Sequence, residues 1–439
     1  MTDLIDDGLP RATTSPDVDV TDLVGCESTT TSRHAEAVAG GFELRRFLVV
    51  SFLTGAALGM TAPITVLYAL SFGASDAMAG LTWATIAIGL AAVDVFGTKF
   101  TPRLNGRMTM WLSLSIFSAG LAVSAAAPNL LVMIAGRVVQ GAGAAIVMSG
   151  ALQVIVRFTP PERTGRAIGA FNAAWFAGIA VGPLAGGLLS EVGEGQEGYR
   201  LAFWVSAATS VIVAIVARLV LPSVPATKPP RLSLPRRASP RHGLRVWPPL
   251  TLGTFSEASR GAIVFTLIPL MGANHLGLST GTIGLALSAL AIVDIASMRF
   301  GGQLADRIGR RLVFAVALAV GAVTCMTAPL IRSLPLFVVW CAALGVPVAM
   351  AWIIPAAMIV DVSTDTEAGL ANYRIAADAG VASGSTTAGV AAGLAGPVGA
   401  IVATGGLLAV IAGWVWRLPE ARVRAAERHD ELPLVLPPD

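Results

Sequence analysis

Apolar runs recur along this sequence between residues 47 and 416, and they limit what the chain can fold into. Each run is about twenty residues long, which is enough to cross the hydrocarbon core of a bilayer as an α-helix. Inside lipid the backbone must satisfy its own hydrogen bonds, so each run is expected to be helical. Twelve spans are predicted, at 47–72, 78–98, 109–127, 130–155, 167–190, 201–221, 250–273, 281–300, 312–331, 335–360, 371–395 and 398–416.

The composition agrees with an all-α integral membrane protein. Of the 439 residues, 54% are hydrophobic and 13% are charged, whereas soluble domains carry about 25% charged residues. The three cysteines and four histidines are scattered without ligand spacing, so neither a disulfide framework nor a metal site is expected. No nucleophile–base set and no phosphate-binding loop is present either. We therefore expect neither an enzyme nor a cofactor-binding protein.

The charged loops predict the orientation of the chain in its membrane. With the N-terminus inside, the inner loops are rich in arginine, whereas the outer loops hold mostly acids such as Asp76 and Glu191, with Arg200 and Arg332 as exceptions. This pattern follows the positive-inside rule and places both termini in the cytoplasm. Almost every basic residue is an arginine, which is typical of a GC-rich bacterial genome. We therefore expect a multi-pass protein of the bacterial cytoplasmic membrane.

Polar segments divide the apolar chain into two halves. Residues 1–45 form a polar arm that is expected to be disordered and cytoplasmic, and 418–439 form a cytoplasmic tail. Residues 222–249 are basic and rich in proline, which predicts an extended cytoplasmic linker, with nucleic-acid binding as a minor alternative. The linker separates a six-helix bundle at 46–221 from a second one at 250–417.

The two halves resemble each other in sequence. AAVDVFGTKF (91–100) aligns without gaps on AIVDIASMRF (291–300), and AGIAVGPLAGG (177–187) aligns on AGVASGSTTAG (379–389). Many transporters are built from such internal repeats, with the substrate site near the membrane midplane between them. We therefore expect two pseudo-symmetric six-helix bundles.

The fifth run contains a glycine-rich stretch, GAFNAAWFAGIAVGPLAGG, at 169–187. Gly178, Gly182 and Gly186 recur every four residues, so they form one helix face without side chains that another helix can approach closely. Pro183 cannot donate a backbone hydrogen bond and should bend the helix. We expect the two halves to move against one another along this face. The alternative is a tightly packed glycine helix with no such role.

Two motifs resemble those of the major facilitator superfamily. The spacing of Gly169, Gly178, Gly182-Pro183 and Gly186-Gly187 resembles the family's fifth-helix antiporter motif, which is associated with exporters more than with uptake carriers. The stretch 301–311 resembles the family's loop signature through GGQLADRIGRR, with Gly302, Leu304, Asp306, Arg307, Gly309, Arg310 and Arg311. The equivalent loop of the first half, FGTKFTPRLNGR, has no acid and departs from the family pattern.

The charges of these loops suggest a conformational role. If a two-fold axis along the membrane normal relates the halves, Asp306 faces the basic loop around Arg163, and the basic loop around Arg103 faces an acidic loop around Asp361. We hypothesise two cytoplasmic ion-pair latches that stabilise the outward-open state. Exposed pairs contribute typically below ~1 kcal/mol each, so they bias the equilibrium without locking it. The alternative is that these charges only set the topology.

An arginine lies within the fourth run. The stretch GRVVQGAGAA (136–145) resembles the arginine motif of the same family, with Arg137 and Gln140. An arginine inside a span is costly and faces protein or water. The resemblance implies a role in proton coupling, in which Arg137 tunes a nearby carboxylate. The alternative is a structural role, in which Arg137 donates to backbone carbonyls.

A proton antiporter needs a membrane carboxylate that can gain and lose its proton near neutral pH. The first span has none, and the candidates elsewhere are Asp94, Glu257, Asp294 and Asp378. Asp94 and Asp294 occupy equivalent repeat positions near the inner surface. Glu257 lies deeper, three residues before Arg260, so the two can form a pair within one helix. We favour Glu257 and Asp378 as the coupling acids.

The sequence gives weaker evidence for the residues that line the substrate cavity than for the coupling acids. By analogy with the family it is lined by spans one, four, seven and ten, with span five contributing. The candidate lining residues are Tyr68, Gln140, Asn172, Trp175, Arg260 and Trp352.

Together these features predict proton-coupled export of an amphipathic small molecule, a drug or a secreted metabolite, by alternating access. The proton gradient supplies the energy, and the partners are the small molecule and membrane lipid rather than nucleic acid. The chain is expected to act as a monomer. An uptake symporter of the same fold is the second candidate, which the fifth-helix motif disfavours. A non-transporting membrane sensor or scaffold is the third, which the altered first-half loop permits.

Overall fold

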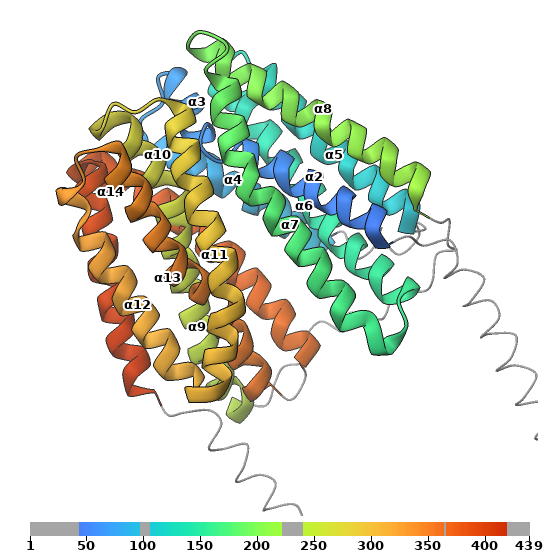
Figure 1. The fold of residues 1–439 in the computed structure, drawn as a ribbon, viewed down its shortest axis with the longest axis vertical. Coiled ribbons are helices and arrows are strands. Elements are labelled where there is room, and N and C mark those ends of the chain that lie inside the picture. The colour runs from blue at the N-terminus through green and yellow to red at the C-terminus, as the bar shows by residue number, and fades with distance from the viewer. Residues whose placement is uncertain (1–43, 97–105, 222–239, 364–365, 419–439) are drawn as a thin grey trace, which may run out of the picture. The chain divides into compact units, whose positions relative to one another are not determined.

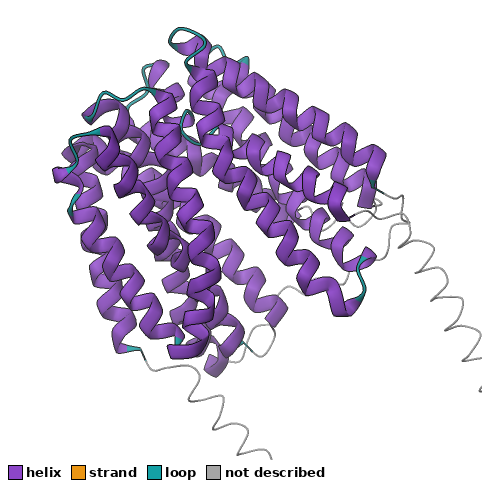
Figure 2. Cartoon of the chain, in the orientation of Figure 1, coloured by secondary structure: helices purple, strands orange, loops and turns teal. Residues whose placement is uncertain are grey.

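The computed structural model describes residues 44–96, 106–221, 240–363 and 366–418, and this part of the chain is helical apart from short turns (Figure 2). The predicted N-terminal arm, most of the predicted linker and almost all of the C-terminal tail lie outside the described residues.

The first bundle consists of α2 (Leu44–Met60), α3 (Thr65–Ser71), α4 (Asp76–Phe96), α5 (Gly106–Ala125), α6 (Leu130–Phe158), α7 (Pro161–Ser190) and α8 (Gln196–Val220) (Figure 1). The second bundle consists of α9 (Pro240–Ala262), η3 (Ile263–Leu267), α10 (Ile268–Leu270), η4 (Met271–His275), α11 (Thr280–Ile308), α12 (Arg310–Met326), η5 (Ala328–Leu330), α13 (Leu334–Val362) and α14 (Thr366–Arg417).

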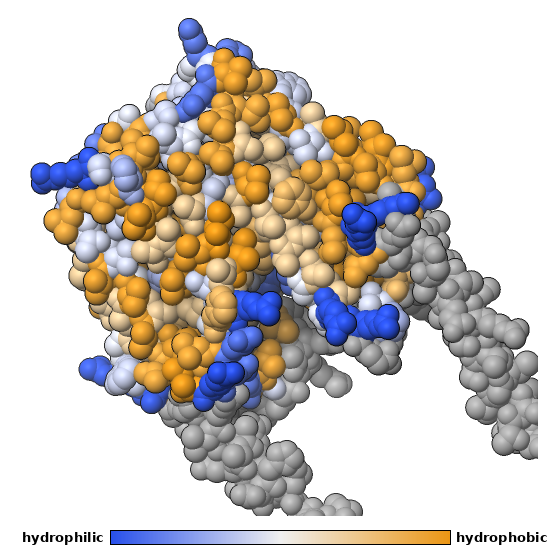
Figure 3. Space-filling view, in the orientation of Figure 1, coloured by the Kyte–Doolittle hydropathy of each residue, from blue (hydrophilic) through white to orange (hydrophobic). Residues whose placement is uncertain are grey.

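Helical segments occupy all twelve positions at which the sequence predicts spans. Nine helices of the described residues are long and apolar enough to cross a membrane by themselves. The difference arises because the described part of α4 contributes a shorter apolar stretch, Asp76–Leu90, because the seventh span is interrupted, and because α14 merges the last two spans across a break at Gly396. Figure 3 shows apolar side chains over the sides of the helices, whereas the strongly hydrophilic ones gather near the helix ends.

Two local departures from the predicted spans have physical causes. Helix α9 begins at Pro240, so the last part of the predicted extended linker is helical; proline is tolerated at a helix start, where its missing N–H has no intrahelical partner. In the same span, the π-helical segment η3 precedes Pro269. Proline removes a backbone donor and crowds the preceding turn, which favours such a local irregularity.

The glycine strip of α7 packs within the first bundle. Gly178 lies against the backbone of Phe52 and Ala56, Gly182 against Gly59, and Gly186 against Met60, all in α2. The expectation that this strip forms the sliding face between the halves is therefore wrong.

The repeat-equivalent glycines show the same packing in the second bundle. Gly380 approaches Thr254, and Gly384 approaches Ala258, both in α9. The strip therefore joins the first and fifth spans of each bundle, because a spacing of four keeps these glycines on one helix face.

Other residues of α7 and α14 make the contacts between the bundles. Gly187 meets Gly281 of α11, and its repeat equivalent Gly389 meets Gly80 of α4. Next to the first contact, Pro183 lies against Gly284. We call these the two glycine crossings, defined by Gly187–Gly281 and Gly389–Gly80. Since α4 begins at Asp76, α7 ends at Ser190 and α11 begins at Thr280, both lie at the same end of the helices.

Polar contacts accompany the crossing between α7 and α11. The Oε1 atom of Glu191 accepts a hydrogen bond from the backbone N–H of Gly281 over 2.7 Å. The hydroxyls of Ser190 and Thr280 are 2.6 Å apart. Ser288 Oγ accepts a hydrogen bond from the backbone N–H of Leu184 over 3.1 Å. The two bundles are therefore joined at this end by backbone approach and by a small number of exchangeable hydrogen bonds.

The close packing of α7 on α2 predicts a contrast between two glycines of the same helix. Gly182→Ala places a methyl group into the backbone of Ala56 and Gly59, and such overpacking costs about 1–3 kcal/mol. It should lower the midpoint of thermal unfolding of the purified protein. Gly169→Ala is the matched control, because a Cβ there meets nothing within 4 Å. Its midpoint should stay unchanged or rise, since alanine favours a helix more than glycine. Equal destabilisation by both substitutions would contradict this packing.

Candidate functional site

The first buried charge lies on α6. Arg137 is completely buried, and its Nη1 atom donates to Gln140 Oε1 over 2.7 Å and to Thr61 Oγ1 over 3.2 Å. Its guanidinium carbon is 4.8 Å from the ring centroid of Trp83 and 5.8 Å from that of Phe203. Gln140 is one turn further along the helix and therefore on the same face. Within the part of the chain that the structure describes, Arg137 is thus held by neutral acceptors and aromatic rings, without the backbone carbonyls of the structural alternative.

The second group of buried charges lies between α9 and α11. Arg260 Nη1 is 3.4 Å from Glu257 Oε2, and Arg260 Nη2 is 3.9 Å from Asp294 Oδ2. Glu257 is fully buried, and Asp294 is 5% exposed. One guanidinium therefore lies between two carboxylates, which leaves one negative charge in excess when all three groups are ionised. The pair within α9 is the one that the three-residue spacing predicts.

Aromatic groups and a third acid surround this cluster. The guanidinium carbon of Arg260 is 5.3 Å from the ring centroid of Trp352 on α13. Tyr373 on α14 donates its hydroxyl hydrogen bond to the backbone oxygen of Trp352 over 2.9 Å. Asp378, also on α14, is within electrostatic range of Glu257. The structure therefore brings together five residues that the sequence predicts for coupling or for the cavity: Glu257, Arg260, Asp294, Trp352 and Asp378.

A pair of stacked aromatic rings connects the two bundles near these charges. Trp83 of α4 and Phe265 of η3 stack with centroids 4.1 Å apart and planes inclined by 17°. Trp83 also makes the cation–π interaction with Arg137. Phe265 lies on the same span as Glu257 and Arg260. The stack therefore links the span that carries the acid cluster to the arginine of the first bundle.

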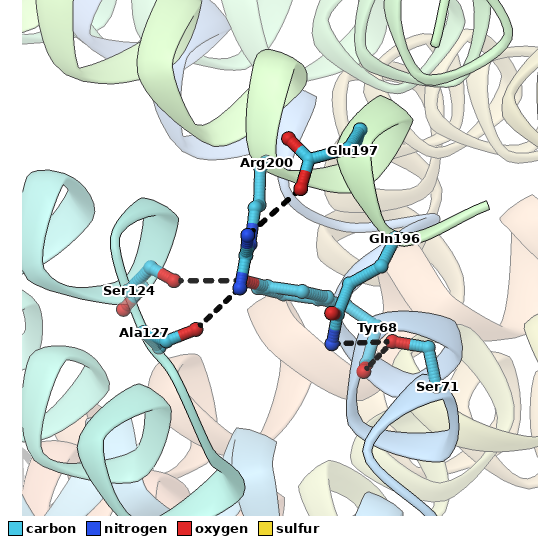
Figure 4. Close-up of polar contacts among 7 residues, drawn as sticks. All are labelled: Tyr68, Ser71, Ser124, Ala127, Gln196, Glu197 and Arg200. Atoms are coloured by element: carbon cyan, nitrogen blue, oxygen red, sulfur yellow. Dashed lines mark hydrogen bonds and ion pairs between the residues drawn. The ribbon is translucent and has the colours of Figure 1, made fainter. Parts of the chain in front are cut away.

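Tyr68 belongs to a separate polar network at one end of the first bundle (Figure 4). Its hydroxyl donates to the backbone oxygen of Ser124 over 3.2 Å and accepts from Arg200 Nε over 3.4 Å. Arg200 also donates to the backbone oxygen of Ala127 and forms an ion pair with Glu197. These contacts tie α3 and α8 to the turn between α5 and α6. They give the completely buried Tyr68 an evident structural role.

Three further candidates from the first bundle lie on α4 and α7. Asn172 is exposed on α7. Trp175 is buried on the same helix, where its ring is 6.3 Å from that of Phe171 and its backbone lies against Gly55 of α2. Asp94 lies on α4, but its side chain is outside the described residues. Their roles in coupling and in the cavity stay predictions.

The loop motif between α11 and α12 folds back on its own bundle. Gly309 has a positive φ of 104°, which glycine adopts without strain, and it allows the chain to start α12 at once. Arg310 pairs with Asp361 of α13 and lies 3.8 Å from Asp306. It also donates to the backbone oxygen of Ala357. Asp361, the acid expected to face the loop around Arg103, thus forms an ion pair within the second bundle. Lys99 and Arg103 themselves lie outside the described residues.

Sequence reasoning missed three residues of this region: Trp83, Phe265 and Tyr373. A tryptophan inside an apolar run gives a weak signal of a polar site. Its indole N–H needs a hydrogen-bond partner when it is buried, but the sequence does not show which one. The position of Phe265 depends on the π-helical segment before Pro269, which the sequence does not reveal. Among the residues that the structure describes, no group of three or more His, Cys, Asp and Glu side chains is placed to hold a metal ion.

Comparison with protein families gives a match over nearly all of the described chain. A family model described as Major Facilitator Superfamily matches residues 47–250 and again residues 250–437. The quinolone resistance protein NorA of Staphylococcus aureus is 24% identical over 170 residues, which cover 39% of this chain and 42% of that protein. The dehydrocurvularin exporter of Alternaria cinerariae is 30% identical over 200 residues, 40% of this chain and 34% of that one. The chain therefore matches less than half the length of either relative.

Solved structures show the same fold. A bacterial homologue of the human lysosomal transporter Spinster, inward-facing and occupied, matches with a TM-score of 0.73 at 18% identity, over 85% of this chain and 95% of that one. A D-xylose–proton symporter matches with a TM-score of 0.66 at 17% identity, over 86% and 98%. At these identities the likeness establishes the fold alone.

The acid cluster predicts a non-additive stability effect. Arg260→Gln leaves Glu257 and Asp294 without their guanidinium, and breaking a buried ion pair costs about 3–5 kcal/mol. It should lower the thermal unfolding midpoint strongly. Adding Glu257→Gln restores the charge balance of the unmodified cluster and should recover part of the loss. Glu197→Gln removes an ion-pair partner whose side chain is 71% exposed, and it should change the midpoint little. Additive losses in the double variant would contradict the paired arrangement.

Proposed function

The chain belongs to the major facilitator superfamily, whose members are transporters and not enzymes, and we propose that it exports an amphipathic small molecule in exchange for protons. The observation that carries the coupling is the buried cluster of Glu257, Arg260 and Asp294. The proposed setting is the bacterial cytoplasmic membrane, with both termini in the cytoplasm and the chain acting as a monomer.

The acid cluster supports proton coupling by its charge balance. Glu257 Oε1 and Asp294 Oδ1 are buried and have no hydrogen-bond partner among the described residues. One proton added to either carboxylate neutralises the excess negative charge of the cluster. Arg260 then has a single ionised partner, so protonation changes which contact it favours. Asp378, within electrostatic range of Glu257, is the second acid that we assign to coupling.

The proposed orientation in the membrane indicates which side of the protein is open. The glycine crossings lie at the ends of the helices near Asp76 and Glu191, opposite to the end that carries Arg310. The positive-inside rule assigns the arginine-rich end to the cytoplasm. The bundles would therefore be joined at the external end, which corresponds to a cavity that opens inward. Transport then requires the two crossings to separate while the opposite ends approach.

Export rather than uptake is supported by two observations. The glycine and proline spacing of α7 resembles that of antiporters, and two relatives in sequence are a quinolone resistance protein and a dehydrocurvularin exporter. The shared stretch covers less than half of each relative, so the substrate class is part of the proposal. A fluorescent quinolone is the probe that these relatives suggest.

Reconstituted vesicles provide the test of direction and coupling. An imposed proton gradient should drive the quinolone opposite to the protons through the unmodified protein. Glu257→Gln should reduce this gradient-driven movement to the level of protein-free vesicles while preserving exchange of labelled for unlabelled quinolone without a gradient. Asp378→Asn should behave in the same way. Glu194→Gln, an exposed acid outside the spans, serves as the control and should retain coupled transport.

Each alternative has its own outcome in this assay. Movement of the quinolone in the same direction as the protons would indicate an uptake symporter. The absence of any movement, for the quinolone and for a wider panel of solutes, would favour a sensor or scaffold. Normal coupling in Glu257→Gln would remove that residue from the mechanism.

Cross-linking tests whether the glycine crossings must separate. In a variant without the native cysteines, Ser190→Cys and Thr280→Cys place two thiols where hydroxyls lie 2.6 Å apart. Oxidation should block gradient-driven transport, and reduction should restore it. A pair within the first bundle, Ser118→Cys and Ala207→Cys, is the matched control because these positions contact each other without joining the bundles. Full transport by the Ser190–Thr280 cross-linked protein would exclude alternating access at this end.

A further inference from the structure

The surroundings of Arg137 contain an excess of buried hydrogen-bond donors. Arg137 Nε and Nη2, Gln140 Nε2 and Trp83 Nε1 are all buried and have no acceptor among the described residues. Only Arg137 Nη1 is satisfied, by Gln140 Oε1 and Thr61 Oγ1. Four unpaired donors on three adjacent side chains, with no competing unpaired acceptor, favour an acceptor-rich group as their partner. A buried donor left unpaired costs about 1–3 kcal/mol.

The charge of this region is also unbalanced. No carboxylate of the described residues forms an ion pair with Arg137, whereas Arg260 has two such partners in the second bundle. The first span, at 47–72, contains no acidic residue that could supply one. A buried charge is expensive unless it is paired. The aromatic faces of Trp83 and Phe203 offset part of this cost but leave the positive charge in place.

We propose that Arg137, Gln140 and Trp83 bind a carboxylate group of the transported molecule. A guanidinium presents its donors in a fixed plane that matches the two oxygens of a carboxylate. The Gln140 amide and the Trp83 indole add neighbouring donors, and the Trp83–Phe265 stack supplies an aromatic wall for an apolar body. The substrate class is therefore an amphipathic organic acid. This assignment rests on the proposed transport function, but binding to the site requires no proton gradient.

The acid cluster of the second bundle would orient the bound molecule. Glu257 and Asp294 carry the excess negative charge of the second bundle and repel an anion. A carboxylate entering between the bundles is therefore attracted to the side of Arg137 and away from the side of Arg260. A molecule with a positive group in addition would present it to the acids. The two bundles thus differ in the charge that they accept.

Calorimetric titration of the purified full-length protein in detergent provides the test. The probes are phenylacetate and phenylacetamide, which share their shape and differ in charge. Hydrogen bonds to charged groups are stronger than neutral ones, so phenylacetate should bind at least about tenfold more tightly. Arg137→Gln should abolish this preference. Arg218→Gln is the matched control, because Arg218 also lies over a tryptophan, with its guanidinium carbon 5.5 Å from the Trp111 ring, but is exposed and outside the site.

A second variant keeps the test decisive if Arg137→Gln does not fold. Trp83→Phe retains the ring against Phe265 and removes one donor, so it should weaken phenylacetate binding severalfold and leave phenylacetamide binding unchanged. Equal affinity of the two probes for the unmodified protein would overturn the proposal and indicate that water alone satisfies these donors. A preference that survives both substitutions would overturn it too.

The same titration separates this proposal from the proposed export function. A phenylacetate preference that depends on Arg137 supports the site even if vesicles show no proton-driven export. Export of neutral solutes without this preference would support the transport function and contradict the site.

Discussion

The close approach of helix backbones at glycine is the constraint on which this structure depends. Helices in lipid gain no hydrophobic free energy from one another, so their association rests on close van der Waals contact and hydrogen bonds. Gly178 and its repeat equivalent Gly380 bring the fifth span of each bundle onto the first. Gly187 and Gly389 bring the bundles together. One helix therefore uses one face for a contact inside its bundle and another face for a contact between the bundles.

The helical scaffold is repeated, but the partners of its two buried arginines differ. Arg260 lies between two carboxylates of its own bundle, whereas the partners of Arg137 among the described residues are neutral acceptors and aromatic rings. Arg137 is fully buried and the Arg260 side chain is only 15% exposed, so both charges need compensation. In the second bundle the protein supplies the opposite charge, and a proton can change that balance. In the first bundle no carboxylate of the described residues pairs with Arg137, and the proposed carboxylate of the substrate would supply the missing charge.

The sequence predicts the helices well because their length and apolar character follow directly from the bilayer. It also predicts the pair of Glu257 and Arg260, because residues three apart on a helix share a face. Glycine spacing reveals a bare face but not which helix covers it, so the sequence does not show that the strip at Gly178 packs on α2 within its own bundle. The stack of Trp83 on Phe265 depends on a π-helical segment and on two distant spans, which no local pattern encodes.

The position of this stack explains how the two charged regions can influence each other. The Trp83 ring contacts both Arg137 and Phe265. Phe265 in turn follows Arg260 by little more than one helical turn. Each bundle contributes one ring to this stack, so the proposed separation of the bundles at the glycine crossings would disturb it. A ligand shifts a conformational equilibrium only by its difference in affinity for the two states. In the proposed mechanism, a group bound at Arg137 against an intact stack would have such a difference, and so would a proton that changes the contacts of Arg260 on the span that carries Phe265. Both would act on the same contact between the bundles, so neither would require a separate pathway to reach the other.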